Sequence, residues 1–217
     1  PTVTNPPKQS RAIKTRAKLM SALESLLRHQ EFEMISVQDI AKEAGVAVGS
    51  VYAHFKDKNA FLAALLAAWR EQVETQLEIS ETQDTAGALI AFGSLHAALF
   101  EATKAVYMQM TENGHILRAL HTYARLHPDA EDDEWQTLVV RSFAPISGLL
   151  NAYAADITIQ DKALATRMLG VYFNTIFIRT ALMPQDTLLE AAELDKDTMI
   201  QQVTDMAYGY LTMPREG

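Results

Sequence analysis

Two short helices joined by a tight turn are predicted for the segment Ser36 to Lys58, which reads SVQDIAKEAGVAVGSVYAHFKDK. Ser36 is a candidate N-cap, and the carboxylate of Asp39 three residues later suits the positive end of a helix. Gly45 stands where the first helix would end, and glycine accepts the left-handed conformation that a tight turn requires. Apolar residues at three- and four-residue spacing would form the buried stripe of that helix, namely Val37, Ile40, Ala41 and Ala44.

The second helix of the pair is predicted from Ala47 to Phe55, after the apolar residue Val46. Val51 and Phe55 stand four residues apart and would face inward. This is the pattern of a helix-turn-helix, in which the second helix lies in the DNA major groove and presents its outer side chains to bases and phosphates. The spacing alone also suits a helical hairpin inside an α-helical protein of another kind.

The outer faces of this pair carry small side chains and hydrogen-bond donors, which suit a close approach to DNA. We expect Ser50, Tyr52 and Lys58 at phosphates. We expect Ala47 and Val48 at base edges, where Val48 could touch a thymine methyl group. The candidate DNA-binding residues are Ser36, Ala47, Val48, Gly49, Ser50, Tyr52, His54 and Lys58.

The same segment resembles the DNA-binding region of the tetracycline-repressor (TetR) family of bacterial regulators, whose motif runs roughly T-v-x-x-I-A-x-x-A-G-v-s-x-g-t-l-Y-x-h-F-x-s-K. The matching residues are Ser36, Val37, Ile40, Ala41, Ala44, Gly45, Val46, Ala47, Gly49, Ser50, Val51, Tyr52, His54, Phe55 and Lys58. The rest of the chain resembles the family in length and helical character. Two positions depart from the pattern: Glu31 stands where the family often has glycine, and Val48 where relatives often carry a polar base-reading residue.

The resemblance implies an all-α protein in two parts. Residues 1–57 would form a three-helix helix-turn-helix domain with a flexible N-terminal arm, and residues 58–217 a larger helical domain for ligand binding and dimerisation. The expected partners are a double-stranded DNA operator, a small-molecule effector and a second copy of the chain, with no cofactor. The expected function is that of a ligand-responsive repressor, released from a near-palindromic operator by a small, largely apolar effector.

Charge is distributed unevenly along the chain. Its net charge is −8, but residues 1–58 carry nine Lys/Arg and six Asp/Glu, whereas residues 59–217 carry ten and twenty-one. The positive end therefore coincides with the predicted helix-turn-helix, as phosphate binding requires. The sequence has no cysteine, no apolar run long enough to span a membrane and no signal-peptide pattern, so we expect a cytoplasmic protein without a membrane partner.

Periodicity predicts further helices on both sides of the motif. The first would run from Ser10 to His29, with a buried stripe of Ile13, Ala17, Met20, Leu23 and Leu27. A helix from Lys58 to Ile79 is expected to be the only covalent connection between the two domains. The remaining helices are expected over about 85–103, 115–127, 130–155 with a kink at Pro145, 163–183 and 196–213.

The helix over 163–183 is apolar nearly all round, so it needs partners on two sides. One helix-turn-helix covers few base pairs, so we expect a dimer that reads a near-palindrome. The predicted interface residues are Leu164, Met168, Val171, Thr175, Ile178, Val203, Met206 and Tyr210. The resemblance also implies an apolar effector pocket with a few polar groups, for which the candidates are Phe92, His96, Phe100, Tyr107, Met110, Leu120, Tyr123, Phe143, Phe173 and Phe177.

Other functions have weaker support in the sequence. An all-α enzyme would need an acid–base site around His96, His115 or Glu101, but no nucleophile, phosphate-binding or metalloprotease motif accompanies them. The acidic run over 128–134 is interpreted as the capped start of a helix rather than a metal site. A DNA-binding regulator without a ligand response is the other alternative. We therefore expect no catalytic residues and no metal site.

Overall fold

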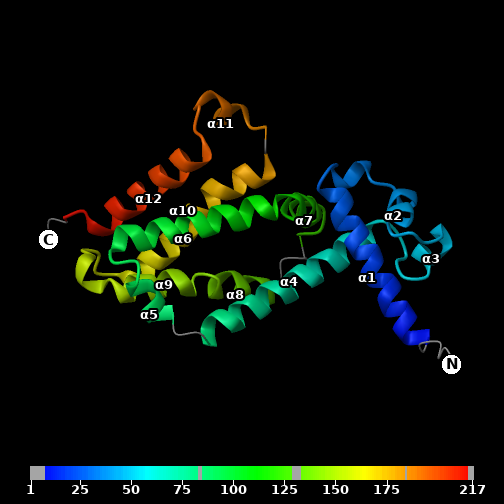
Figure 1. Ribbon diagram of the computed structural model, residues 1–217, viewed down its shortest axis with the longest axis horizontal. Helices are drawn as coiled ribbons and strands as arrows, with labels where there is room; N and C mark the ends of the chain where they lie inside the picture. Colours follow the sequence, from blue (N-terminus) through cyan, green and yellow to red (C-terminus); the bar gives the residue numbers. More distant parts are fainter. Residues whose placement is uncertain (1–7, 83–84, 129–132, 184, 215–217) are drawn as a thin grey trace. The chain divides into compact units, whose positions relative to one another are not determined.

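The computed structural model describes residues 8–82, 85–128, 133–183 and 185–214 (Figure 1). Within these ranges the regular structure is helical and no β-strand occurs, as the all-α prediction requires. The helices are α1 (Lys8–Leu27), η1 (Phe32–Met34), α2 (Val37–Glu43), α3 (Val48–Tyr52), α4 (Asn59–Thr82), α5 (Thr85–Ile90), α6 (Leu95–Glu112), α7 (Gly114–Leu126), α8 (Asp133–Arg141), α9 (Ala144–Ala152), η3 (Ala154–Asp156), α10 (Lys162–Leu182), α11 (Thr187–Ala191) and α12 (Lys196–Thr212). None of the helices in the described ranges has both the length and the apolar character needed to cross a membrane.

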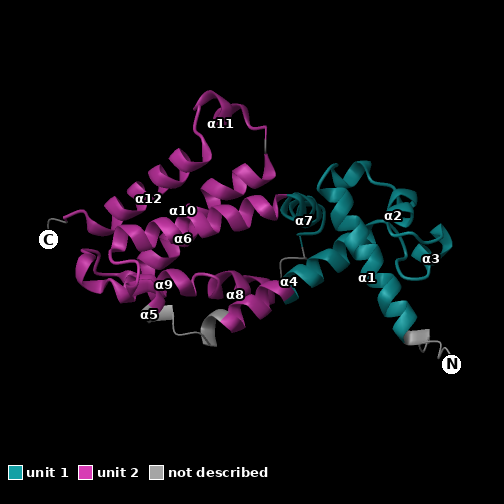
Figure 2. Ribbon diagram, viewed as in Figure 1, with its two compact units in different colours: residues 1–71, 115–130 teal, residues 72–114, 131–217 magenta. Residues whose placement is uncertain are grey.

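The chain divides into two compact units (Figure 2). Unit 1 comprises residues 1–71 and 115–130, and unit 2 comprises residues 72–114 and 131–217. The boundary lies inside α4 and not between residues 57 and 58, where the sequence analysis divided the chain. Because α7 belongs to unit 1, the chain passes between the units three times. The expectation that the helix starting near Lys58 is the only covalent connection is therefore wrong.

The core of unit 1 explains why α7 belongs to it. The most deeply buried side chains of α1, α2 and α4 include Leu19, Ile40 and Phe61, each 0 % exposed. From α7, Ile116, Ala119 and Leu120 complete the same cluster, and Tyr123 packs against it. Contacts between residues so distant in sequence are set by the tertiary fold, and local periodicity carries no trace of them.

The buried stripe of α1 agrees with the predicted one only in its second half. Leu23 and Leu27 are buried as predicted and Met20 packs against the core, but Ile13 is 63 % exposed and Ala17 is also exposed. Leu19 and Ala22 are buried in their place. Both stripes have helical spacing, because apolar residues occur on more than one side of this helix. The choice between them depends on where α2 and α4 pack, which the sequence of α1 does not encode.

Unit 2 is a bundle in which α6, α10 and α12 lie side by side, with α9 against α5, α6 and α10 (Figure 1). Its core contains Leu99, Leu150, Leu169, Phe177 and Val203 among its most buried side chains. The tyrosine ring of Tyr107 meets the ring of Phe177 edge-on, with 5.4 Å between their centroids. These contacts keep the central face of α10 inside the bundle.

Two of the predicted long helices are interrupted. The helix expected over 85–103 is divided into α5 and α6 by a turn in which Gly93 has φ +79°, and Ser94 caps α6 by accepting from the backbone N–H of Ala97. Pro145 was expected to kink one helix, but it stands in the first turn of α9. N–H groups of the first turn have no acceptor within the helix, so the missing N–H of proline costs no hydrogen bond there. Ser142 and Phe143 separate α9 from α8.

Candidate DNA-binding site

The N-terminus of α2 is fixed by a capping box. The backbone N–H of Asp39 donates to the Ser36 hydroxyl over 3.1 Å, and the backbone N–H of Ser36 donates to the Asp39 carboxylate over 2.9 Å. The hydrogen bonds from Ser36 lower the pKa of Asp39. The predicted N-cap is confirmed, and the Ser36 side chain is engaged in positioning α2.

The turn between α2 and α3 also has the predicted geometry. Gly45 adopts φ +65°, in the left-handed region. The backbone N–H of Val46 donates to the carbonyl of Ala41 over 3.0 Å, which closes the end of α2. Beyond the turn, α3 is shorter than predicted and spans Val48–Tyr52, but Val51 and Phe55 are buried as expected, at 0 % and 3 % exposure.

Most of the predicted DNA-contacting residues lie on the open side of α3 or beside it. Val48 is 38 % exposed and Tyr52 is 56 % exposed, four residues apart on one face of the helix. Ala47 and Gly49 are also exposed, and a methyl group added to Gly49 would meet no atom within 4 Å. A further pair, Ser50 and His54, is half-buried. The outer face of α3 is therefore uncharged and open, with the small residues Ala47 and Gly49 beside Val48 and Tyr52.

Lys58 is placed differently from the sequence expectation. Its ammonium donates to the backbone carbonyl of Glu33 over 3.0 Å and lies 4.5 Å from the centre of the Phe32 ring. Burial lowers the pKa of Lys58. The side chain joins η1 to the start of α4, so its ammonium has a hydrogen-bond partner within unit 1.

Arg16 lies over Phe55, three residues after the end of α3, and the sequence analysis did not select it. Its guanidinium carbon is 4.6 Å from the centre of the Phe55 ring. Phe55 in turn stacks on Phe61, with 3.9 Å between ring centroids and 21° between ring planes. A sequence signal for Arg16 does exist: extended backward by three residues, the stripe of Leu19 and Leu23 reaches position 16.

His115, in the first turn of α7, is a buried histidine of unit 1. Its imidazole is 6 % exposed, and its Nε2 lies 3.6 Å from the Glu24 carboxylate. Burial lowers the pKa of His115, Arg28 and Arg118 lower it further, and Glu24 opposes them. Arg118 forms an ion pair with Glu31 at 3.2 Å. Polar contacts to α1 and to the segment after it thus accompany the apolar packing of α7.

The predicted dimer residues of α10 lie on its outer face. Leu164, Met168 and Val171 are 46 %, 48 % and 54 % exposed, Thr175 is exposed and Ile178 is half-buried. On α12, Met206 is 56 % exposed and Tyr210 is half-buried, whereas Val203 is buried in the core of unit 2 at 1 % exposure. An apolar cavity of about 230 Å³ opens between the two helices, lined by Met168, Leu169, Tyr172, Met206, Ala207 and Tyr210.

The ten predicted effector residues are divided between the two units. Leu120 and Tyr123 belong to the core of unit 1, whereas the others belong to unit 2. Phe92 is 44 % exposed in the turn before α6, and the rings of Phe173 and Phe177 fill the core. Tyr107 and Met110 pack against that core, and Phe100 and Phe143 are half-buried. The cavity between α10 and α12 contains none of the ten.

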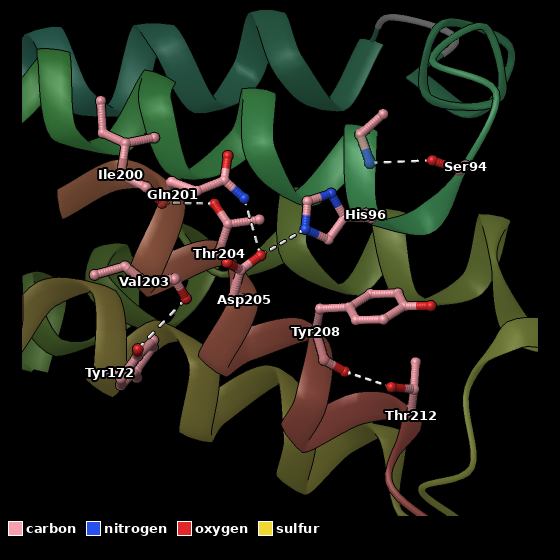
Figure 3. Close-up of polar contacts among 11 residues, drawn as sticks. Ser94, His96, Tyr172, Ile200, Gln201, Val203, Thr204, Asp205, Tyr208 and Thr212 are labelled. Carbon is pink, nitrogen blue, oxygen red and sulfur yellow. Dashed lines mark hydrogen bonds and ion pairs between the residues drawn. The ribbon is translucent and has the colours of Figure 1, made fainter. Parts of the chain in front are cut away.

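His96, predicted to orient an effector, contacts residues of α12 (Figure 3). Its Nε2 lies 2.7 Å from the carboxylate of Asp205, which also accepts from the Gln201 amide over 2.9 Å. The hydrogen bond with His96 lowers the pKa of Asp205. The ring of Tyr208 meets the imidazole edge-on, with 5.2 Å between centroids. In the structure, the contact between His96 and Asp205 links α6 to α12.

The residues considered for an acid–base site have other side chains as partners. Glu101 contacts Lys104 at 3.5 Å on the same helix, and His96 contacts Asp205. His115 belongs to the other unit. Of the acidic run over 128–134, residues 129–132 lie outside the described residues. Asp133 and Glu134 stand in the first turn of α8, as the helix-start interpretation predicts.

A helix-turn-helix with a small, exposed second helix, followed by a larger helical bundle, is the architecture of a class of DNA-binding regulators of transcription. Residues 19–65 match the family described as "Bacterial regulatory proteins, tetR family". No curated protein matches the sequence. The chain resembles the TetR family, as its motif indicated.

Solved structures share the fold at low sequence identity. A TetR-family transcriptional regulator from Mesorhizobium loti is 16 % identical with a TM-score of 0.62, covering 92 % of this chain and 96 % of its own. FadR from Bacillus subtilis, in complex with stearoyl-CoA, is 16 % identical with a TM-score of 0.56, and the match covers 89 % of this chain and 97 % of FadR. NalD, the secondary repressor of the MexAB-OprM multidrug efflux pump in Pseudomonas aeruginosa, is 16 % identical with a TM-score of 0.52. The match covers 95 % of this chain and 100 % of NalD.

Proposed function

We propose that the chain is a ligand-responsive repressor that binds a near-palindromic DNA operator as a homodimer. The observation that carries the proposal is the outer face of α3, which is exposed and uncharged and is held by the capping box at Ser36 and the turn at Gly45. Residues 1–57 contribute the DNA-contacting elements, and residues 58–217 bind the effector and form the dimer. The proposed DNA-facing residues are Ser36, Ala47, Val48, Gly49, Ser50, Tyr52 and His54.

DNA binding is tested with duplexes selected from a random-sequence library by the purified protein. We expect enrichment of a two-fold symmetric sequence with half-sites about 34–36 Å apart, one turn of DNA. Tyr52→Ala should weaken binding to the selected duplex, whereas Leu188→Ala, which also alters an exposed side chain, should not. Failure to enrich any sequence would refute specific DNA binding.

The exposed apolar face of α10, together with Met206 and Tyr210 of α12, supports the dimer. Exposed apolar patches of this kind mark interaction surfaces, and a two-fold axis lets the same patch cover itself. We expect Val171→Glu to yield a monomer of 24.1 kDa in analytical ultracentrifugation. Leu188→Glu, on α11, should leave the dimer intact. A wild-type chain that sediments as a monomer at micromolar concentration would contradict the proposal.

The effector is proposed to bind among the apolar and aromatic residues of unit 2, with the Tyr107 hydroxyl as a polar contact. Burial raises the pKa of Tyr107, with a further contribution from Asp197, so the hydroxyl stays protonated and able to donate. Opening the packed core for a ligand would shift the chain between two arrangements, to the extent that the ligand prefers one of them.

Stearoyl-CoA, seen in the FadR complex, is the first effector to test. For a coupling free energy of about 1–3 kcal/mol, saturating ligand should lower operator affinity roughly 5- to 150-fold, and DNA should weaken ligand binding by the same factor. Native mass spectrometry of the purified protein would identify any other ligand that copurifies. A ligand bound tightly in unit 2 that left operator affinity unchanged would favour a regulator without a ligand response.

A further inference from the structure

We propose that Arg16 binds a DNA phosphate beside the recognition helix, with Phe55 as the positioning residue that holds its guanidinium in place. The inference rests on the proposed DNA binding and names a contact residue that lies outside the helix-turn-helix. It also replaces Lys58 as the cation at this end of α3.

The position of Arg16 on α1 follows from helical geometry. It precedes the fully buried Leu19 by three residues and Leu23 by seven, so it stands on the side of α1 that faces the core of unit 1. Lys14 and Lys18 stand two residues before and after it, which directs them to about the opposite side of the helix. Of these three cations, Arg16 is the one whose side of α1 meets Phe55.

Phe55 holds the guanidinium where the core of unit 1 meets the solvent. The Phe55 side chain comes three residues after the end of α3, and its backbone N–H donates to the carbonyl of Val51 over 2.9 Å. Its ring is 3 % exposed and stacks on Phe61, so it cannot turn freely. Arg16 is exposed although its guanidinium lies 4.6 Å from that ring. The cation is therefore fixed at the C-terminal end of the recognition helix.

The charges around Arg16 leave it available for an anion. Within the described part of the chain, no carboxylate lies within ion-pair distance of its guanidinium. Arg28, which directly follows the last residue of α1, differs because its guanidinium is bonded to Glu24 at 3.0 Å. Lys58 differs too, because its ammonium is bonded to the Glu33 carbonyl.

An arginine held over an aromatic ring is suited to phosphate. When the flat face of a guanidinium lies on a ring, the N–H groups of its edge remain available for two parallel hydrogen bonds to phosphate oxygens. Because Phe55 already holds the side chain, less conformational freedom is lost on binding. Phosphate contacts of this kind set the register of a recognition helix on the duplex without reading its sequence.

The test measures the salt dependence of binding to the selected duplex and to a shuffled duplex. Arg16→Met keeps an unbranched side chain over Phe55 and removes the charge. Because the proposed dimer carries two Arg16 side chains, we expect Arg16→Met to lower affinity for both duplexes roughly tenfold for each lost contact. The slope of log affinity against log salt should fall by about 1.8, which is about 0.9 for each phosphate contact. Arg28→Met, at the residue directly after α1, is the matched control and should leave the slope unchanged. Thermal unfolding of each variant verifies that unit 1 remains folded.

Arg16→Lys tests the role of the stack. It keeps the charge but has no planar group, so we expect the salt slope to be retained while affinity falls by less than in Arg16→Met. If wild type binds the selected duplex and Arg16→Met leaves affinity and slope unchanged, the phosphate contact is refuted while DNA binding stands. If wild type binds no duplex, both proposals fail. A loss confined to the selected duplex would assign Arg16 to base recognition and overturn the phosphate role.

Discussion

Gly45 and Gly49 stand four residues apart in the helix-turn-helix, and the same substitution should have opposite effects on them. Gly45 has φ +65°, and Gly49 lies within α3. A Cβ added at either position would meet no atom within 4 Å. Neither Gly45→Ala nor Gly49→Ala therefore introduces a clash, and the two changes differ only in the backbone conformation that alanine must adopt.

The expected magnitudes follow from that conformation. An L-residue in the left-handed region costs about 1–2 kcal/mol, while alanine loses less chain entropy than glycine on folding, about 0.4–1 kcal/mol. Gly45→Ala should thus destabilise unit 1 by roughly 1 kcal/mol. Gly49→Ala should stabilise it by about 0.5–1 kcal/mol, because alanine is the better helix former. The unfolded-state contribution is common to both variants, so their difference isolates the left-handed penalty.

Urea unfolding followed by tryptophan fluorescence can measure this in unit 1. The chain has two tryptophans, of which Trp69 belongs to unit 1 and Trp135 to unit 2. In a Trp135→Phe background, the fluorescence reports on unit 1 alone. Equal shifts of the two variants in the same direction would refute the conformational argument. Gly49→Ala should also weaken DNA binding despite the added stability, since its methyl group lies on the proposed DNA-facing side of α3.

Three further predictions concern other contacts. Because burial lowers the pKa of His115, the unfolded chain binds the proton more readily than the folded chain. The stability of unit 1 should therefore fall as pH drops below about 6.5. Unfolding measured at several pH values should show a smaller pH dependence in His115→Gln. Gly170→Ala would place a Cβ 2.5 Å from the Phe143 ring and should destabilise unit 2 by about 1–3 kcal/mol; an undiminished loss in a Phe143→Ala background would show that the ring is not the cause. Lys58→Ala should lower the stability of unit 1 without changing the salt slope of DNA binding, and a lower slope would restore its sequence-based assignment to a phosphate.

The helix-turn-helix could be predicted from the sequence because its determinants are local. The capping box joins Ser36 to Asp39, three residues later. The positive φ at the turn favours glycine at position 45, and Val51 and Phe55 lie one helical turn apart. The exposed stripe of α10 was predicted for a similar reason. On a helix that is apolar on two sides, Leu169, Phe173 and Phe177 form the inner side and leave Leu164 and Val171 outside.

The remaining features depend on contacts between distant residues. Ile13 and Leu19 are equally acceptable on a helical stripe, and only the packing of α2 and α4 selects Leu19. Lys58 was assigned to phosphate on its charge and position, but the carbonyl of Glu33 lies within reach of its ammonium. The predicted effector residues were grouped by chemistry, and chemistry alone did not show that Leu120 and Tyr123 belong to unit 1.

The membership of α7 in unit 1 has a consequence for the order in which the chain can fold during synthesis. When residue 71 has been synthesised, the apolar surface of unit 1 that packs against Ile116, Ala119 and Leu120 is still exposed to solvent, because those residues follow more than forty positions later. Unit 1 must therefore wait for a segment that passes first through unit 2, and its apolar surface stays open to other chains in the interval. A fragment ending at residue 71 would contain the whole DNA-binding motif, yet it would keep that surface exposed and be prone to aggregation.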